Sequence, residues 1–420
     1  MDLTGGLGSF LRSARANATV AWLLLFGVGS IAAVSVVVGD LLWAGFALAI
    51  IAIALVPPAT FRAGRVMLPW EVLALVTFPL AGRVLASGGM TQLLASHVAI
   101  AALALIVAVE LHVFTPVRMT DWFAVAFVIV TTLATAGLWA VVQWVSDVIL
   151  GTQLIPNLRI LMIHFTGAKI AGFGAGILFT YYFRRTSTVH HRCCPGFDLR
   201  DQPVAPAYPS VKFRDRIGIS KQREHQVVRI LQLSLAGFFV IGLSQGDLSV
   251  IVNSSLAFFV TQLPAVLERD YHLSMDSGLV LWITAAVFVH AVGALGPYQT
   301  VWWWDNVAHA LSASVVAAVG YTTVRAVSIY SSEVSIPPRL LAIFVLLFVV
   351  AAGVFWEVIE FLAGHLAILV GFDGVLIQYG VTDTVLDIVF DIIGGLIVAT
   401  WGAAYLSVPI RDLTDWLDRQ

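Results

Sequence analysis

Residues 356–395 contain two acidic motifs joined by a connecting segment, Trp356-Glu-Val-Ile-Glu-Phe361 and Asp383-Thr-Val-Leu-Asp-Ile-Val-Phe-Asp-Ile-Ile-Gly-Gly395. Five carboxylates therefore lie in sequence that is otherwise apolar enough for a membrane. A helix advances about 100° per residue, so Asp383, Asp387 and Asp391 form one stripe. Glu357 and Glu360 share a face of the preceding helix. Ionisable residues inside a bilayer are costly and face the interior of a bundle, so these five are functional candidates.

The composition of the whole chain indicates an all-α polytopic membrane protein. Of the 420 residues, 59% are hydrophobic and 11% are charged, and the mean hydropathy is +0.92. A water-soluble domain with a polar surface does not reach these values. A net charge of -2, with no basic face outside one loop, gives no support for nucleic-acid binding. The lipid bilayer is the expected surrounding.

About twelve stretches are long enough to span the hydrocarbon core, six between residues 19 and 183 and six between 226 and 407. Between the two sets lies a linker, residues 184–225, and extended to Arg229 it holds ten of the 23 Lys and Arg residues. The positive-inside rule places this linker and both termini in the cytoplasm, since most other Arg residues fall on its side. We therefore predict a multi-pass protein of the cell membrane.

The first three stretches of the two sets match at a constant offset of 207 residues. Gly39-Asp40 corresponds to Gly246-Asp247, Pro57 to Pro264, and Arg62 to Arg269. With small insertions, His97 corresponds to His309. We predict two parallel six-helix repeats: residues 1–183 form a degenerate copy and residues 226–420 carry the site.

The first repeat lacks the acids of the second and carries basic residues instead. Opposite Glu357 and Glu360 stand Ala140 and Gln143. Arg83 and Lys169 lie in the first repeat, and we interpret them as anchors for an anionic headgroup.

The predicted topology brings polar residues of four helices of the second repeat to one depth. Asp305 and His309 begin one helix with i,i+4 spacing, and His290 ends the helix before it. Because no Lys or Arg of this repeat is expected at that depth, the carboxylates cannot all carry an uncompensated charge. Bound divalent ions, bound protons or sodium, and a hydrogen-bonded packing network are the three explanations.

Carboxylates combined with imidazoles suit divalent ions such as Mg, Mn, Zn, Ca or Fe. In that case the expected ligands are Asp305, His309, Glu357, Glu360, Asp387 and Asp391. His290 or Asp383 would then handle protons.

The second repeat, from about residue 253 to 406, resembles the uncharacterised YjdF-like integral membrane proteins, and in outline the VanZ-like proteins. The resemblance lies in Leu263-Pro264, Trp304-Asp305-x-x-x-His309, Trp356-Glu357-x-x-Glu360-Phe361 and Asp383-Thr384-x-x-Asp387-x-x-x-Asp391-x-x-Gly394. His290 departs from the pattern, because an acidic residue is expected there. The resemblance implies a multi-pass membrane fold with its site in these motifs.

The leading functional hypothesis is a membrane-embedded, metal-dependent enzyme that acts on a lipid or polyprenyl-linked substrate at the outer leaflet. The alternative is a proton- or sodium-coupled transporter, which intramembrane acids and repeats also suit. A non-catalytic accessory subunit is the third possibility.

Overall fold

A computed structural model describes residues 13–85, 90–115, 117, 120–185, 193, 221–271, 273, 275, 277–331, 334, 336–371, 378–406, 410, 413, 414, 416 and 417. Within these ranges the secondary structure is helical and contains no strand. The all-α prediction is confirmed. Most of the predicted linker, residue 118, residue 373 and residues 411 and 419 lie outside the described residues, and the orientation in the membrane stays a prediction.

The helices before the linker are α2 (Ala14–Val37), α3 (Leu41–Ala54), α4 (Val56–Thr60), α5 (Trp70–Leu85), α6 (Met90–Phe114), α7 (Asp121–Leu150) and α8 (Leu158–Arg185). Those after it are α11 (Lys221–Gln245), α12 (Leu248–Tyr271), α13 (Ser277–Ala294), α14 (Pro297–Thr300), α15 (Trp304–Tyr330), α16 (Pro338–Leu369) and α17 (Val381–Tyr405). Apolar segments in a membrane form helices because a helix satisfies the hydrogen bonds of its backbone within the segment itself.

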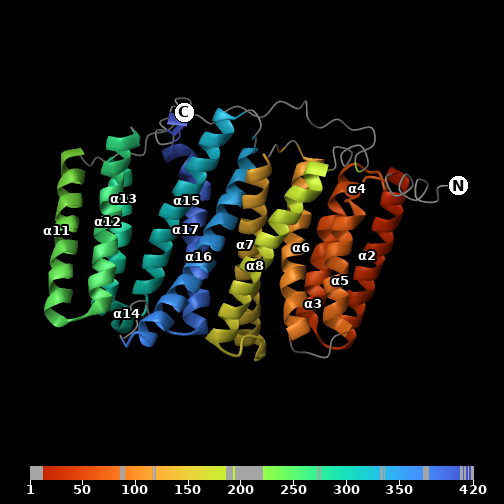
Figure 1. Ribbon diagram of the computed structural model, residues 1–420, viewed down its shortest axis with the longest axis horizontal. Helices are drawn as coiled ribbons and strands as arrows, with labels where there is room; N and C mark the ends of the chain where they lie inside the picture. Colours follow the sequence, from red (N-terminus) through yellow and green to blue (C-terminus); the bar gives the residue numbers. More distant parts are fainter. Residues whose placement is uncertain are drawn as a thin grey trace. The chain divides into compact units, whose positions relative to one another are not determined.

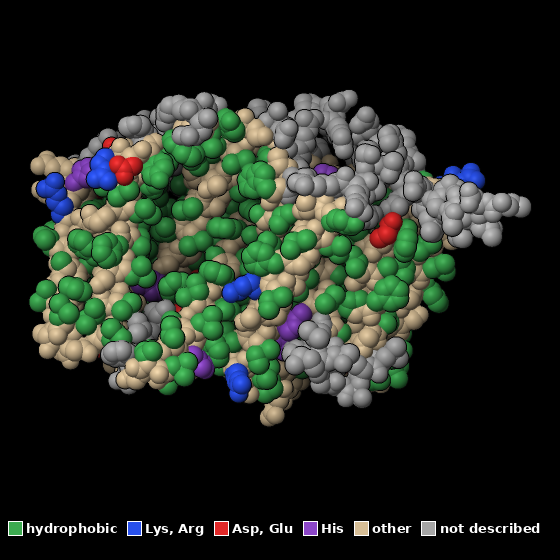
Figure 2. Space-filling view, in the orientation of Figure 1, with side chains coloured by type: hydrophobic (Ala, Val, Ile, Leu, Met, Phe, Trp, Pro, Cys, Tyr) green, Lys and Arg blue, Asp and Glu red, His purple; other side chains and the backbone are tan. Residues whose placement is uncertain are grey.

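Nine helices in the described part of the chain are long and apolar enough to cross a membrane. Helices α3, α5 and α17 occupy the remaining three predicted spans, and α17 carries the three aspartates. Hydrophobic side chains are spread across the face seen in Figure 2. Phe26, Leu233 and Phe259 are each at least 70% exposed, as expected for side chains in contact with lipid. A multi-pass membrane protein is confirmed, while the number twelve stays a prediction.

The chain forms two compact units that do not follow the predicted division at the linker. Unit 1 comprises residues 1–136 and 163–204, and unit 2 comprises residues 137–162 and 205–420. The second half of α7 thus belongs to unit 2, where Trp144 Nε1 donates to Thr382 Oγ1 at 3.2 Å. The predicted boundaries and the two parallel repeats stay predictions.

Unit 1 is held at its first helix by a buried amide. Asn17 donates from Nδ2 to the carbonyl of Leu68 at 3.1 Å, and its Oδ1 accepts from the Trp70 backbone N–H at 3.1 Å. These bonds satisfy the backbone at the start of α5, where no helical partner exists.

Pro57 and Pro264, which correspond at the offset of 207 residues, have different surroundings. Pro57 lies in the short helix α4, after a break that follows Ala54, whereas Pro264 lies inside the continuous helix α12. A single proline removes one hydrogen bond, but Pro57 is followed by Pro58, and two successive prolines remove two. The helix therefore breaks in one case only.

In unit 2 successive helices run in alternating directions. Figure 1 shows that the α11–α12 turn, α14, the end of α16 and the start of α17 lie at one end of this unit. Gly394 on α17 lies against the backbone of α15, since a Cβ there would collide with the Ala310 carbonyl oxygen and approach the Ser314 nitrogen to 2.9 Å. Small residues permit such close approach between membrane helices. This contact brings the aspartates of α17 to α15.

Candidate metal centre

His309 is the central residue of the acidic site. It lies one turn after Asp305 on α15 and is buried, with 7% of its surface exposed. Its Nδ1 is 3.3 Å from Asp391 Oδ1. Its Nε2 is 3.7 Å from Asp305 Oδ1 and 3.7 Å from Asp387 Oδ1. One ring nitrogen therefore has a hydrogen-bond partner, and the other points between two carboxylates.

The Asp391 contact depends on a glycine. A Cβ at Gly353 on α16 would collide with Asp391 Oδ2. Because Gly353 has no side chain, there is space for the buried Asp391 carboxylate to reach His309. Asp391 is among the metal ligands expected from the sequence, whereas in the structure its carboxylate contacts Nδ1 of His309.

Asp305, His309 and Asp387 form the group whose geometry fits a metal ion. One ligand atom from each lies within 4.8 Å of the others. A distance of 3.7 Å is long for a hydrogen bond. Two ligands at ordinary bond lengths around a tetrahedral ion are separated by about 3.4 Å, close to the observed spacing. The residues therefore fit a divalent ion with one imidazole and two carboxylate ligands.

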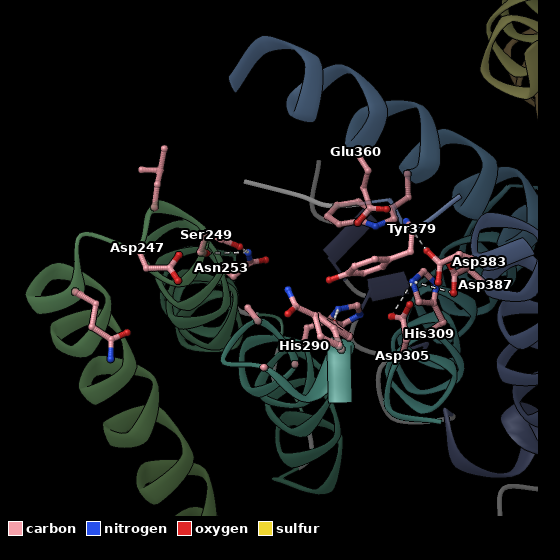
Figure 3. A pocket seen from close by; sticks show the side chains of 18 of the residues that line it. Asp247, Ser249, Asn253, His290, Asp305, His309, Glu360, Tyr379, Asp383 and Asp387 are labelled. Carbon is pink, nitrogen blue, oxygen red and sulfur yellow. Dashed lines mark hydrogen bonds and ion pairs between the residues drawn. The ribbon is translucent and has the colours of Figure 1, made fainter. Parts of the chain in front are cut away.

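These three residues open into a polar cavity of about 550 Å³ in unit 2. Figure 3 shows its side chains converging from α12, α13, α15, α16 and α17. The acidic and imidazole residues that line it are Asp247, His290, Asp305, His309, Glu360, Asp383 and Asp387. Neither Lys nor Arg occurs among its described lining residues. The described lining of the cavity thus combines several carboxylates with two imidazoles.

His290 lies near the end of α13 and faces the same cavity. Its ring centroid is 5.7 Å from that of His309, and its Nδ1 is 2.5 Å from the hydroxyl of Tyr298. Tyr298 comes from α14 and packs on Gly293, where a Cβ would collide with the phenol ring. Burial raises the pKa of Tyr298 above its usual range, so the phenol keeps its proton.

The remaining predicted site residues of unit 2 separate into two groups. Asp383 and Glu360 line the polar cavity, and Asp383 Oδ2 accepts from the Tyr379 backbone N–H at 3.0 Å. Glu357 is 1% exposed and is not among the described cavity residues. Its Oε2 accepts from Gln378 Nε2 at 2.7 Å, and the same amide reaches the Glu357 carbonyl at 2.9 Å.

Arg83 and Lys169 belong to unit 1. Arg83 forms an ion pair of 3.1 Å with Asp40, and its guanidinium lies 4.3 Å from the ring centroid of Trp43. Lys169 lies on α8. The structure thus gives Arg83 a carboxylate partner within its own unit.

Several cavity residues were absent from the sequence-based candidates. Tyr298, Tyr379, Asn253 and Asp247 line the polar cavity, and Gln378 holds Glu357. Asp247 belongs to the Gly-Asp pair that occurs in both halves of the sequence, and Tyr298 follows Gly293 and Gly296 beside a tryptophan-rich segment. Gly296 has a φ of +132°, which glycine adopts readily, and it forms the turn into α14.

The second half of the chain is similar to predicted membrane proteins. A family model described as "Predicted membrane protein (DUF2238)" matches residues 227–407, and one described as "Domain of unknown function (DUF8268)" matches residues 5–67. An uncharacterized protein of Thermotoga maritima is 29% identical over 183 residues, which cover 41% of this chain and 87% of the relative. No solved structure matches significantly. The resemblance of the second half to an uncharacterised family of membrane proteins is confirmed. The similarity to the VanZ-like proteins stays a prediction.

Proposed function

We propose that this protein is a membrane-embedded, metal-dependent enzyme that acts on a lipid or polyprenyl-linked substrate at the outer leaflet. In this proposal Asp305, His309 and Asp387 bind one divalent ion. Three protein ligands leave a coordination position for substrate or water, as in catalytic metal sites. A divalent ion held there would polarise a phosphoryl or carbonyl oxygen or activate water.

The arrangement around His309 supports this proposal most strongly. Asp391 accepts from Nδ1, and that bond orients Nε2 toward Asp305 and Asp387. A carboxylate on the second nitrogen of a ligating histidine fixes its tautomer and raises its basicity. A network built only for helix packing would place hydrogen-bonded partners at both nitrogens, yet the Nε2 distances are 3.7 Å.

Charge balance gives independent support. A buried carboxylate that lacks a compensating charge is costly. Removing the partner of a buried ion pair, for example, destabilises a protein by about 3–5 kcal/mol. The described cavity residues include five carboxylates and two imidazoles. A bound cation would compensate part of this negative charge at the point where the ligand atoms converge.

The other cavity residues receive roles from their positions. Asp383 and Glu360 line the cavity without belonging to the three-residue group, so we assign proton handling to them. His290 is hydrogen-bonded to Tyr298 through Nδ1, so Nε2 is the ring nitrogen that remains for a contact with bound substrate. Glu357 positions α16 through Gln378.

Placement at the outer leaflet rests on the distribution of Lys and Arg in the sequence. Single cysteines in the 184–225 linker and beside Tyr298, in a Cys193→Ser, Cys194→Ser background, test it. An impermeant thiol reagent added to intact cells should label the cysteine near Tyr298 and spare the linker. Labelling of the linker alone would move the site to the inner leaflet.

Metal analysis tests the function directly. Wild-type protein purified in detergent and equilibrated with Mn²⁺ or Zn²⁺ should hold about one ion per chain, and Asp387→Asn should weaken binding at least tenfold. An ion present at 100 times its Kd stabilises the folded state by about 2.7 kcal/mol, so wild type should gain thermal stability from the metal and the variant should not. Glu360→Gln should retain the ion.

Asp270→Asn provides the control, because Asp270 pairs with Arg269 on an exposed part of α12. It should bind the ion as wild type does. Wild-type protein without stoichiometric metal, together with an Asp387→Asn variant of equal or higher stability, would exclude the metal site. Proton or sodium flux in proteoliposomes would then test the transporter alternative.

A further inference from the structure

A second cavity of about 540 Å³ lies in unit 2 and has an apolar lining. Its walls come mainly from α12, α13, α15 and α16, and include Val260, Val287, Val316, Val349 and Ile359. Asp391 of α17 also lines it. The metal-centre proposal uses none of the aliphatic side chains. Its size falls within the range of about 300–1,000 Å³ typical of ligand pockets.

The apolar and polar cavities adjoin each other at the metal centre. Asn253, His290, His309 and Trp356 line both of them. A molecule that occupies both would therefore place its apolar part among valines and alanines and its polar part beside the imidazoles. Such a molecule is an amphiphile.

The apolar cavity also lies on a surface that faces hydrocarbon. Figure 2 shows this face hollowed between α13 and α16, with hydrophobic side chains around the recess. Phe355, which lines the cavity, is 47% exposed. An alkyl or isoprenoid chain can therefore enter sideways from the membrane without crossing water.

We propose that the apolar cavity binds the hydrocarbon chain of an amphiphilic substrate whose oxygen-rich headgroup, such as a phosphate, reaches the Asp305–His309–Asp387 group. This inference rests on the proposed function for the headgroup contact. Lipid tails are as apolar as the cavity walls, so transfer of the chain from the bilayer contributes little affinity. The cavity selects the chain by shape and holds the headgroup in register with the metal group.

Photolabelling in lipid nanodiscs tests this arrangement. The probe is dodecyl phosphate with a diazirine at the chain end, and the comparison probe has the same chain without the phosphate. With Mn²⁺ present, peptide mapping should find at least fivefold more phosphate probe than comparison probe on cavity residues of α12, α13, α15 and α16. Equal labelling by both probes would overturn the proposal, because any membrane groove admits lipid chains.

Two variants fill the cavity without touching the metal group. Ala286→Phe and Ala352→Phe replace small side chains of its lining on α13 and α16. Each should reduce cavity labelling at least fivefold and leave the Mn²⁺ content unchanged. Ala236→Phe on an exposed position of α11 is the matched control and should label as wild type does. Undiminished labelling in whichever cavity-filling variant folds would contradict the proposal.

Measuring the metal content and the labelled residues in the same preparation separates this inference from the proposed function. If wild type holds stoichiometric Mn²⁺ but the probe labels only lipid-facing residues outside the cavity, the chain site is wrong and the metal centre stands. If the protein holds no metal but the phosphate probe still labels the cavity preferentially, the chain site stands and the metal-dependent function is wrong.

Discussion

His97 in unit 1 and His309 in unit 2, paired by the predicted repeat, have contrasting surroundings. His97 packs on Gly167, where a Cβ would lie 2.5 to 2.8 Å from the ring atoms, and its ring centroid is 5.1 Å from that of His164. His309 contacts three aspartates and opens into a cavity of about 550 Å³. Both imidazoles are buried, but His97 is enclosed by packing, whereas His309 lines a cavity in which a ligand fits.

The charged groups of the two units show a related difference. Arg83 in unit 1 has Asp40 and the Trp43 ring as partners, with its side chain 16% exposed. The ion pair and the cation–π contact balance its charge within the protein. In unit 2 the described cavity combines five carboxylates with two imidazoles. A site with unbalanced charge can bind an ion, whereas a balanced pair fixes helices.

One local structure is nevertheless the same in both units. Gly39 has a φ of +82° and Gly246 a φ of +69°. The backbone of Asp40 donates to the Ser35 carbonyl at 2.8 Å, and that of Asp247 donates to the Gly242 carbonyl at 3.0 Å. These donors and acceptors correspond at the offset of 207, so the sequence match extends to the geometry of this turn.

The histidines give the largest expected difference between the units. His309→Gln should abolish stoichiometric Mn²⁺ or Zn²⁺ binding, weakening it at least 100-fold, because it removes the ligand oriented by Asp391. His97→Gln should leave the metal content unchanged and cost about 1–3 kcal/mol of stability through disturbed packing against Gly167. Elemental analysis and thermal unfolding in detergent measure the two effects. Loss of metal in both variants would remove the functional contrast between the units.

The turn glycines give a smaller effect that should be equal in both units. Gly39→Ala and Gly246→Ala each force a side chain into the left-handed region, at a cost of about 1–2 kcal/mol. Gly45→Ala and Gly237→Ala, in open helical positions, are the matched controls and should be neutral or slightly stabilising. Unfolding by denaturant in detergent measures all four. A cost at only one of the turns would weaken the evidence for duplication.

The amino-acid sequence alone was sufficient for the features that depend on spacing and composition. Hydrophobic length predicted the membrane helices, and the i,i+4 spacing of Asp305 and His309 predicted a shared helix face. The four-residue spacing of Asp383, Asp387 and Asp391 predicted their stripe on α17. These features follow from the geometry of one helix, which local sequence determines.

Tertiary structure decided which of these residues meet. Gly394 brings α17 against α15, and Gly353 admits the Asp391 carboxylate to His309 Nδ1. Glu357, on the same face as Glu360, is hydrogen-bonded by Gln378 from the segment before α17. The hydroxyl of Tyr298 and the apolar cavity beside His290 likewise depend on α13, α14, α15 and α16 together. Helix spacing fixes the direction of a side chain, but the neighbour that it contacts depends on how closely separate helices pack, which no single segment encodes.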